Sequence, residues 1–330
     1  MTEIPVVVAS DERYLPPTYV TLYSMLRNAG QETFYAVYLL CPCRAAQAAR
    51  QFLGQLEKEF SNCRVTILDM GEKFSDVKMK IAHISSPTFF RLCLPGELSE
   101  LEKCIYLDSD IIVNGDLTEL YETDMTNAYL AGVLSEGIQT NRVYQRELCR
   151  RIGLPDVKSY INAGVLVLNL ELLRRDCIME KWLALVGGDF PAQDQDILNL
   201  VCHGRIRLLP LKYNAMTKCC AIRCSENEIS AQVYSREEID EARHAPVIIH
   251  YADRIKPWAD SNSLFADLWW NAANSIGQPE VRSAVIDFAR SAVVPRDTLG
   301  QKGKRKLLYV LQLAGLYAPL KKIEDKLKHR

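Results

Sequence analysis

The chain has 330 residues, of which 48% are hydrophobic and 25% are charged, and its formal net charge is -1. This length allows about two domains, or one large α/β domain with an extension. A nearly neutral chain is not expected to bind nucleic acid in general, and no run approaches the roughly 18 apolar residues of a membrane-spanning helix. The eleven cysteines are odd in number and scattered, which favours reduced thiols in a reducing compartment.

The charge is unevenly distributed along the chain. Residues 296–330 carry ten Lys or Arg and three acidic residues, so this segment is strongly basic while the rest of the chain is acidic. The first apolar run begins almost at Met1, so a signal peptide is not expected. Together these features predict a cytoplasmic protein.

The first half of the chain alternates apolar runs with helical patterns. Apolar runs that predict strands occupy residues 4–10, 34–41, 64–70 and 103–110. Residues 17–30 and 44–60 between them have apolar positions at helical spacing, and Gly30 is a stop signal for the first of these helices. This alternation predicts an α/β fold with a mainly parallel sheet, which binds ligands beyond the carboxyl ends of its strands.

The second half continues the same domain with less regular signals. Further strands, loops and helices are expected within residues 129–136, 162–175, 193–201, 205–214 and 247–258. Neither internal repeats nor low-complexity tracts occur, and no linker rich in Pro, Gly or Ser precedes about Gly277. We therefore divide the chain into a domain of residues 1–276 and a basic helical extension of residues 277–330.

Two aspartates, Asp108 and Asp110, follow the apolar run "CIYL". If they lie on a strand, both carboxylates point to one side and present oxygen ligands suited to Mg²⁺ or Mn²⁺. The alternative is an acidic strand end that caps the turn at Asn114 and Gly115. An unpaired buried charge is costly, so the strand must either end at this point or hold a cation there.

Other polar groups at the ends of apolar runs are candidates for a site. Asp194 and Asp196 open a helical pattern, where Asp194 also fits an N-cap. Asn162 precedes Ala163 and Gly164. Because Gly164 has no side chain, backbone amides at this position could approach a ligand. The alternative is a turn before a buried strand.

His250 ends another apolar run, six residues before Lys256. The pair fits a metal ligand beside a phosphate-binding lysine, or a buried structural histidine. The cluster Cys219, Cys220 and Cys224 has no matching second pair of ligands, so it is interpreted as packing cysteines rather than a zinc site.

The two common nucleotide-binding glycine motifs are missing, because there is no G-x-x-x-x-G-K-[ST] and no G-x-G-x-x-G after the first strand. A haloacid-dehalogenase-like phosphatase is one alternative, but its nucleophilic Asp is normally followed by "GT" near the chain start. Here Ile111 and Ile112 follow the second aspartate instead. A catalytically silent sugar-nucleotide binder is another alternative.

Six blocks in order within residues 4–258 carry a more specific signal: "VVVASDERY", "HISSPTFFRL", "YLDSDIIV", "NAGVLVLNL", "QDQDILN" and "HYADRIKPW". In these blocks the chain resembles the retaining glycosyltransferases of family 8, which include bacterial lipooligosaccharide α-galactosyltransferases and glycogenin-like enzymes. The resemblance implies a GT-A fold, a UDP-sugar donor and a divalent metal, usually Mn²⁺ and alternatively Mg²⁺. The transferred sugar would be glucose or galactose, and the acceptor a glycan or a lipid-linked glycan.

The resemblance also implies roles for individual residues. The metal ligands would be Asp108, Asp110 and His250. The nucleotide and its diphosphate would be bound by Ala9, Asp11, Tyr14, His83, Ala163 and Lys256, with Asp11 and Tyr14 on the uracil and with Lys256 and His83 on the diphosphate. The donor sugar would be surrounded by Arg91, Asn162, Ala163, Asp194 and Gln195. Two positions depart from the family pattern, since Asp253 replaces a usual glycine and Arg13 a common asparagine.

Retention of the anomeric configuration has two possible routes. Double displacement needs a nucleophile such as Gln195 or Asp194, whereas front-face attack lets the departing phosphate take the acceptor proton. An amide is a poor nucleophile, so the front-face route is favoured.

The basic extension combines lysine clusters with the apolar stretch "LLYVLQLAGLYAPL". Such a segment suits the surface of an anionic membrane, where each Lys or Arg contributes about 1 kcal/mol. A helix packed on the domain is the alternative. The membrane interpretation predicts peripheral association with the inner face of the cell membrane.

Overall fold

The computed structural model describes residues 2–79, 85–217, 219–220, 233–252 and 254–292. His83, Cys224, Asp253 and the basic segment from residue 293 onwards lie outside these ranges, so the predictions made for them remain predictions. Among the helices within the described ranges, none has both the length and the apolar character needed to cross a bilayer.

The first half of the chain forms the alternating strands and helices that its apolar runs predict. The elements in chain order are β1 (Thr2–Ala9), η1 (Glu12–Tyr14), α1 (Leu15–Arg27), β2 (Thr33–Cys41), α2 (Cys43–Leu53), α3 (Leu56–Glu59), β3 (Cys63–Asp69), η2 (Ser86–Cys93), α4 (Leu94–Glu97), β4 (Lys103–Leu107), β5 (Ile111–Val113) and α5 (Thr118–Tyr121). The single helix expected over residues 44–60 is divided into α2 and α3 at Gly54. A Cβ on Gly54 would lie 2.6 Å from the carbonyl oxygen of Arg50, so this tight junction requires glycine.

The second half contains shorter elements. They are β6 (Leu130–Leu134), α6 (Glu136–Gln139), α7 (Arg142–Ile152), β7 (Ile161–Asn169), α8 (Leu170–Arg175), α9 (Ile178–Leu183), α10 (Asp194–Val201), β8 (Ile206–Leu208), η3 (Leu211–Asn214), β9 (Ala215–Met216), α12 (Arg236–His244), β10 (Ile248–His250), α13 (Ala266–Ser275) and α14 (Pro279–Ser291).

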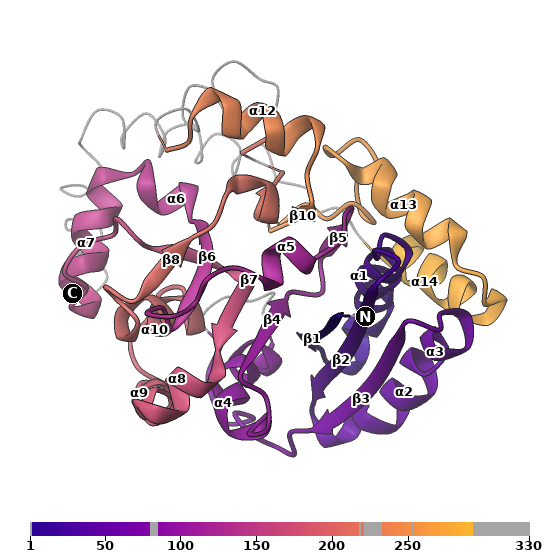
Figure 1. Cartoon of the computed structure of the whole chain (residues 1–330), viewed down its shortest axis with the longest axis horizontal. Helices are drawn as coiled ribbons and strands as arrows, with labels where there is room; N and C mark the ends of the chain where they lie inside the picture. Colours follow the sequence, from indigo (N-terminus) through magenta and orange to yellow (C-terminus); the bar gives the residue numbers. More distant parts are fainter. Residues whose placement is uncertain (1, 80–84, 218, 221–232, 253, 293–330) are drawn as a thin grey trace, which may run out of the picture.

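A seven-stranded sheet in the order β3-β2-β1-β4-β7-β6-β8 forms the centre of the fold (Figure 1). Only β7 runs antiparallel to its neighbours, so the prediction of a mainly parallel sheet is confirmed. The chain builds β1, β2 and β3 outward in one direction and then returns to place β4 on the other side of β1. The carboxyl ends of β1 and β4 are thus adjacent at the point where the strand order reverses, which is where open α/β sheets bind ligands.

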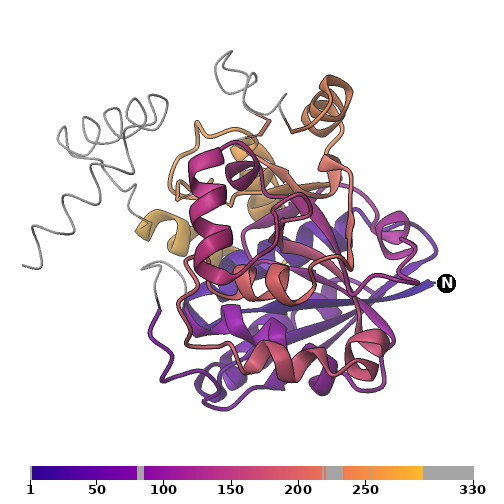
Figure 2. The ribbon, with the colours of Figure 1, turned by 90° about the vertical axis from the view of Figure 1, so that its left-hand side faces the viewer.

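Both faces of the sheet are covered, and the side chains along each strand alternate between two apolar cores. On β1, Val6 and Val8 belong to one core and Val7 to the other. Helices α1, α2, α13 and α14 contribute to the first core, while η2, α4, α8, α9 and α10 contribute to the second. Figure 2, turned by 90°, shows helices on both sides of the strands. Burial on both faces explains why these strands have nearly continuous apolar sequences.

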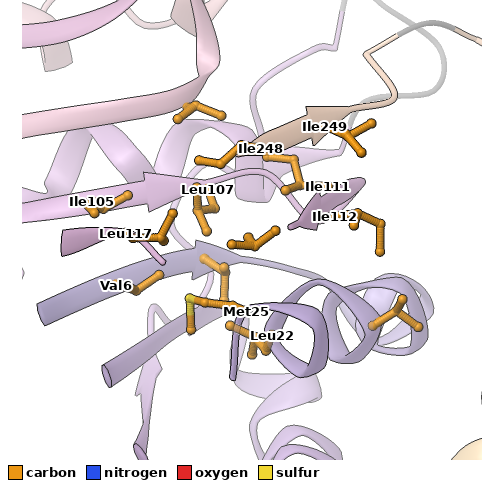
Figure 3. Close-up of a cluster of buried hydrophobic side chains, with 14 of the residues drawn as sticks. Val6, Leu22, Met25, Ile105, Leu107, Ile111, Ile112, Leu117, Ile248 and Ile249 are labelled. Atoms are coloured by element: carbon orange, nitrogen blue, oxygen red, sulfur yellow. The ribbon is translucent and has the colours of Figure 1, made fainter. Parts of the chain in front are cut away.

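A small second sheet in the order β5-β10-β9 extends from the end of β4. β5 pairs antiparallel with β10, and Ile111 is opposite His250. Apolar side chains of β5 and β10 pack together with Leu107 and with Leu22 and Met25 of α1 (Figure 3). This packing fixes the chain on both sides of residues 108–110.

Helix α14, the first part of the predicted extension, packs against α1 and α13 (Figure 1). The Phe288 ring lies 6.3 Å from the Tyr14 ring and 5.7 Å from the Trp258 ring, measured between centroids. The buried side chains Val281, Val285 and Ala289 join the core formed by α1. Tyr14 therefore rests on a helix that is distant in the sequence.

Candidate active site

A cavity of about 360 Å³ opens beyond the carboxyl ends of β1 and β4. It is lined by every residue within the described ranges to which the family resemblance assigns a role in binding or catalysis: Ala9, Asp11, Tyr14, Arg91, Asp108, Asp110, Asn162, Ala163, Asp194, Gln195, His250 and Lys256. These residues come from separate segments spread between residues 9 and 256 of the chain. The fold brings all of them into one cavity.

The two acidic residues lie in a turn rather than on a strand. β4 ends at Leu107 and β5 begins at Ile111, so the alternation of a strand does not orient Asp108 and Asp110 as expected. The Nε2 atom of His250 lies 3.3 Å from Oδ1 of Asp110 and 3.7 Å from Oδ2 of Asp108. One potential ligand atom from each of the three residues lies within 4.8 Å of the others. The pairing of β10 with β5 produces this convergence.

Two buried threonines of α1 hold the turn in place. The Thr18 hydroxyl donates to Oγ of Ser109 at 2.9 Å, and Ser109 donates in turn to the carbonyl of Ala9. The Thr21 hydroxyl is bonded to the backbone of Ser109 and Ile111. The middle residue of the acidic motif is thus tied to β1 and α1, while its two neighbours face the cavity. The sequence analysis missed both threonines, which carry no signal beyond a polar position in an apolar helix.

Lys256 lies against Asp110, with its Nζ 2.6 Å from Oδ2 of the carboxylate. Burial alone would raise the pKa of Asp110, but the positive charge of Lys256, with a smaller contribution from the His250 side chain, outweighs it and holds this pKa well below its usual range. Burial would likewise lower the pKa of Lys256, and the Asp110 carboxylate raises it instead. Both groups therefore remain charged at neutral pH.

Arg91 connects two of the acidic groups from below. One terminal nitrogen of Arg91 donates to Oδ1 of Asp108 at 2.9 Å, and its Nε lies 3.1 Å from Oδ2 of Asp194. The guanidinium also stacks over the Tyr106 ring, at 4.2 Å from the centroid. Burial opposes the charge of Arg91, and Asp108 and Asp194 together raise its pKa well above the usual value. Arg91 is thus a permanently charged link beneath the cavity.

Asp194 is the first residue of α10, and its carboxylate faces the cavity rather than capping the helix. Gln193 is the N-cap residue, with a φ of 54°, and the Asp194 carboxylate instead accepts a hydrogen bond from Thr88 at 2.9 Å. Burial raises the pKa of Asp194 to about 6, and the charge of Arg91 counteracts this only in part. Asp196 points elsewhere and accepts bonds from Tyr160 and the amide of Ala192.

Asn162 and Gln195 form a hydrogen-bonded wall of the cavity. Oε1 of Gln195 accepts from Nδ2 of Asn162 at 3.2 Å and from the amide of Ala163 at 3.1 Å. The amide of Gly164 donates to Oδ1 of Asn162. These two backbone amides are already used within the protein, contrary to the expectation that Gly164 exposes them to a ligand.

Gly164 has a different function, which is to leave room for the acidic cluster. A Cβ at this position would lie 2.2 Å from Cε1 of His250 and 2.8 Å from Oδ2 of Asp108. Asn214 is a further residue that the sequence analysis missed. Its side chain, which is fully buried, lies between Asn162 and His250 at 2.9 Å from each.

Ala9, Asp11 and Tyr14 also line the cavity. Asp11 caps η1 by accepting from the amide of Tyr14. The Tyr14 ring packs edge-on against Trp258, which follows Lys256 closely in the chain. Cys219 and Cys220, in contrast, are buried away from this cavity. Within the described ranges, Asp108, Asp110 and His250 form a group whose potential ligand atoms lie close enough together to hold a metal.

Comparison with known proteins agrees with this architecture. The sequence model described as glycosyl transferase family 8 matches residues 5–262. The chain belongs to glycosyl transferase family 8. The predicted resemblance is confirmed.

Several curated proteins of related sequence are named as glycosyltransferases. A "Putative glycosyltransferase" of Haemophilus influenzae is 31% identical over 63% of this chain and 62% of its own length. "Glycosyltransferase GlyE" of Streptococcus pneumoniae is 26% identical over 82% of this chain and 60% of its own length. "Lipopolysaccharide 1,2-glucosyltransferase" of Escherichia coli is 31% identical over 80% of this chain and 76% of its own length. The chain thus spans about three fifths of the length of the first two.

Solved structures show the same fold. The galactosyltransferase LgtC, crystallised with donor and acceptor sugar analogs, superposes with a TM-score of 0.69 at 25% identity and covers 86% of this chain and 100% of LgtC. The apo structure of the bifunctional glycosyltransferase WbbM gives a TM-score of 0.71 at 22% identity over 86% of this chain and 51% of WbbM. The prediction of the GT-A fold shared by family 8 is therefore confirmed.

The space left by Gly164 leads to a first prediction. We expect Gly164→Ala to lower the free energy of unfolding by about 1–3 kcal/mol, because His250 or β7 must move to admit the methyl group. Gly137→Ala on α6 is the matched control, since a Cβ there meets nothing within 4 Å. Urea unfolding of both variants measures the difference. Equal stability of the two variants would show that the contact around Gly164 is not tight.

The buried carboxyl group of Asp194 leads to a second prediction, on pH dependence. Its pKa is raised on folding, so its contribution to stability is present below the unfolded value of 3.8 and is lost as the pH rises through about 6. We therefore expect Asp194→Asn to gain roughly 1 kcal/mol of stability relative to the unmodified protein between pH 5 and pH 7.5. Urea unfolding in EDTA at both pH values measures this change, and a difference that does not vary with pH would contradict the raised pKa.

Proposed function

We propose that this protein is a retaining, metal-dependent hexosyltransferase that moves glucose or galactose from a UDP-sugar to a glycan or lipid-linked acceptor. The observation that carries this proposal is the convergence of Asp108, Asp110 and His250 within 4.8 Å in the same cavity as Lys256. Family membership supports the glycosyl transfer itself. The donor, the metal and the acceptor are inferred from the chemistry of the cavity and from similar proteins.

The acidic cluster fits a divalent cation. Carboxylate oxygens suit Mg²⁺ and Mn²⁺, and an imidazole nitrogen favours Mn²⁺ over Mg²⁺. In the described part of the cavity, Asp11, Asp108, Asp110 and Asp194 provide four carboxyl groups, whereas Arg91 and Lys256 provide two positive charges. A diphosphate could not approach such a surface without added positive charge. The ligands would be Asp108, Asp110 and His250, and the metal would supply Lewis-acid stabilisation of the leaving diphosphate.

The protein's own groups account for the remaining parts of the donor. In the proposal, Tyr14 and Asp11 bind the uracil, and Ala9 lies beside the nucleotide. Lys256 binds the diphosphate, where its charge favours the departing phosphate more strongly than the intact donor. His83 is proposed for the same diphosphate on the basis of the family resemblance alone.

The sugar end of the cavity is lined by Arg91, Asn162, Ala163, Asp194 and Gln195. Asp194 would accept hydrogen bonds from sugar hydroxyls, and Arg91 would keep its carboxylate in place. Oε1 of Gln195 already accepts from Asn162 and from the Ala163 amide, which makes it a fixed dipole rather than a free nucleophile. This arrangement supports front-face transfer, in which the anomeric carbon exchanges its bond to the diphosphate for one to the acceptor oxygen. The departing phosphate oxygen takes the acceptor proton.

The similarity to a protein named lipopolysaccharide 1,2-glucosyltransferase supports an acceptor that belongs to a cell-envelope glycan. A basic segment at residues 296–330 is consistent with this proposal, since an envelope glycan assembled on lipid lies at an anionic membrane surface. Family membership and the GT-A fold oppose the phosphatase alternative. A silent sugar-nucleotide binder remains as the alternative that the experiment below must separate.

The test is release of UDP from a panel of UDP-sugars, with Mn²⁺ added after EDTA treatment. We expect UDP-glucose or UDP-galactose to be hydrolysed slowly, and faster with a lipopolysaccharide-type acceptor. Asp110→Asn should lower the rate on the order of a hundredfold or more, because it weakens charge stabilisation at the leaving group by several kcal/mol.

The matched control is Asp124→Asn, since Asp124 is exposed and paired with Arg207 outside the cavity. It should retain the full rate. Binding of UDP-sugars without turnover would identify a silent binder. A normal rate for Asp110→Asn would refute the metal assignment.

A further inference from the structure

Asn214 is a fully buried polar side chain that contacts both His250 and Asn162. It ends η3, just before β9, and it does not line the cavity. Its Nδ2 lies 2.9 Å from Oδ1 of Asn162, and its Oδ1 lies 2.9 Å from Nδ1 of His250. Such a side chain must find its partners within the protein, because water cannot satisfy it.

The orientation of this amide follows from the backbone. Oδ1 of Asn162 accepts from the amide of Gly164, so that atom of Asn162 must be the oxygen. Asn214 therefore presents its NH₂ group to Asn162 and its oxygen to His250. Since an amide oxygen can only accept, Nδ1 of His250 must carry a hydrogen.

From this geometry we infer that Asn214 is a positioning residue that keeps a hydrogen on Nδ1 of His250 and so selects the Nδ1–H tautomer whenever the ring is neutral. Nε2 is then the ring nitrogen that faces Asp110 and Asp108, which lie 3.3 and 3.7 Å away, and its lone pair is the one available to a metal between them. Isolated histidine prefers the other tautomer, in which Nε2 carries the hydrogen and cannot bind a metal. The consequence for metal binding rests on the proposed function, whereas the tautomer itself does not.

The same amide continues a chain of hydrogen bonds in one direction. His250 donates to Asn214, Asn214 donates to Asn162, and Asn162 donates to Oε1 of Gln195. Each amide accepts from one neighbour and donates to the next, so reversing any one of them leaves a buried mismatch. Asn214 thereby couples the orientation of the predicted metal ligand to the predicted sugar-binding wall.

The tautomer can be measured in the metal-free protein. ¹⁵N NMR of labelled full-length protein, with His250→Gln to assign the signal among five histidines, reports which ring nitrogen carries the hydrogen. We expect Nδ1 to carry a hydrogen in the unmodified protein and in Asn214→Asp, whose carboxylate still accepts from Nδ1. In Asn214→Leu we expect a form without a hydrogen on Nδ1 to become populated. An Nδ1 that carries no hydrogen in the unmodified protein, or an unchanged Nδ1 signal in Asn214→Leu, would overturn the inference.

The consequence is measured as Mn²⁺ affinity by electron paramagnetic resonance of free Mn²⁺. Loss of an outer partner of a metal-binding histidine typically weakens metal affinity 10- to 100-fold, which is the loss expected for Asn214→Leu. Asn214→Asp should bind more tightly than Asn214→Leu, because its carboxylate still accepts from Nδ1 of His250 although the bond to Asn162 is lost. Asn199→Leu is the control, because it removes an equally buried amide that bonds Ile161 and the Gln195 backbone instead of His250.

The outcomes separate the two claims. If Asn199→Leu loses as much affinity as Asn214→Leu, or if Asn214→Asp binds as weakly as Asn214→Leu, the positioning role is wrong. If the unmodified protein binds no Mn²⁺ at all, the proposed metal dependence fails, and the NMR measurement still decides the role of Asn214.

Discussion

Electrostatic pairing beneath the cavity is the interaction on which the rest of the site depends. Arg91 joins Asp108 to Asp194, and Lys256 holds Asp110. These groups are largely removed from water, so each charge requires a partner. The carboxylates still exceed the cations, which makes the cavity suited to a ligand that brings positive charge together with a diphosphate. Burial of the charges therefore explains their pairing in the protein, and the excess of carboxylates over cations explains the proposed binding of a metal with a diphosphate.

The scaffold places these charges with elements that have no catalytic group of their own. Thr18 and Thr21 of α1 anchor the turn between β4 and β5, and the small sheet sets His250 against it. Gly164 leaves the space in which the histidine ring lies. Helix α14 supports the Tyr14 ring through Phe288, so residues beyond the family match at 5–262 also contribute to the part of the cavity that Tyr14 lines. The site is a property of the whole described fold rather than of its motifs.

Much of this could be predicted from the sequence, and physical reasons explain the rest. Apolar runs bounded by turn signals predict β1 to β4 well, because buried parallel strands must be apolar on both faces. The acidic pair, His250 and Gln195 were predicted from their motif blocks, and the fold brings them into one cavity. The turn at Asp108 could not be predicted, because two aspartates one residue apart give the same sequence pattern whether the strand continues or ends. Thr18, Thr21 and Asn214 act through contacts with residues that are distant in sequence, and no local pattern reports such contacts.

The central claim is that Asp108, Asp110 and His250 together hold a divalent metal at the donor site. The most direct measurement is anomalous X-ray diffraction at the manganese edge, from crystals grown with Mn²⁺ and UDP. The account predicts an anomalous peak bonded to both carboxylates and to Nε2 of His250, with the UDP phosphates on its open side. A UDP molecule bound in the cavity with no anomalous peak there, or a peak held by other residues, would contradict it.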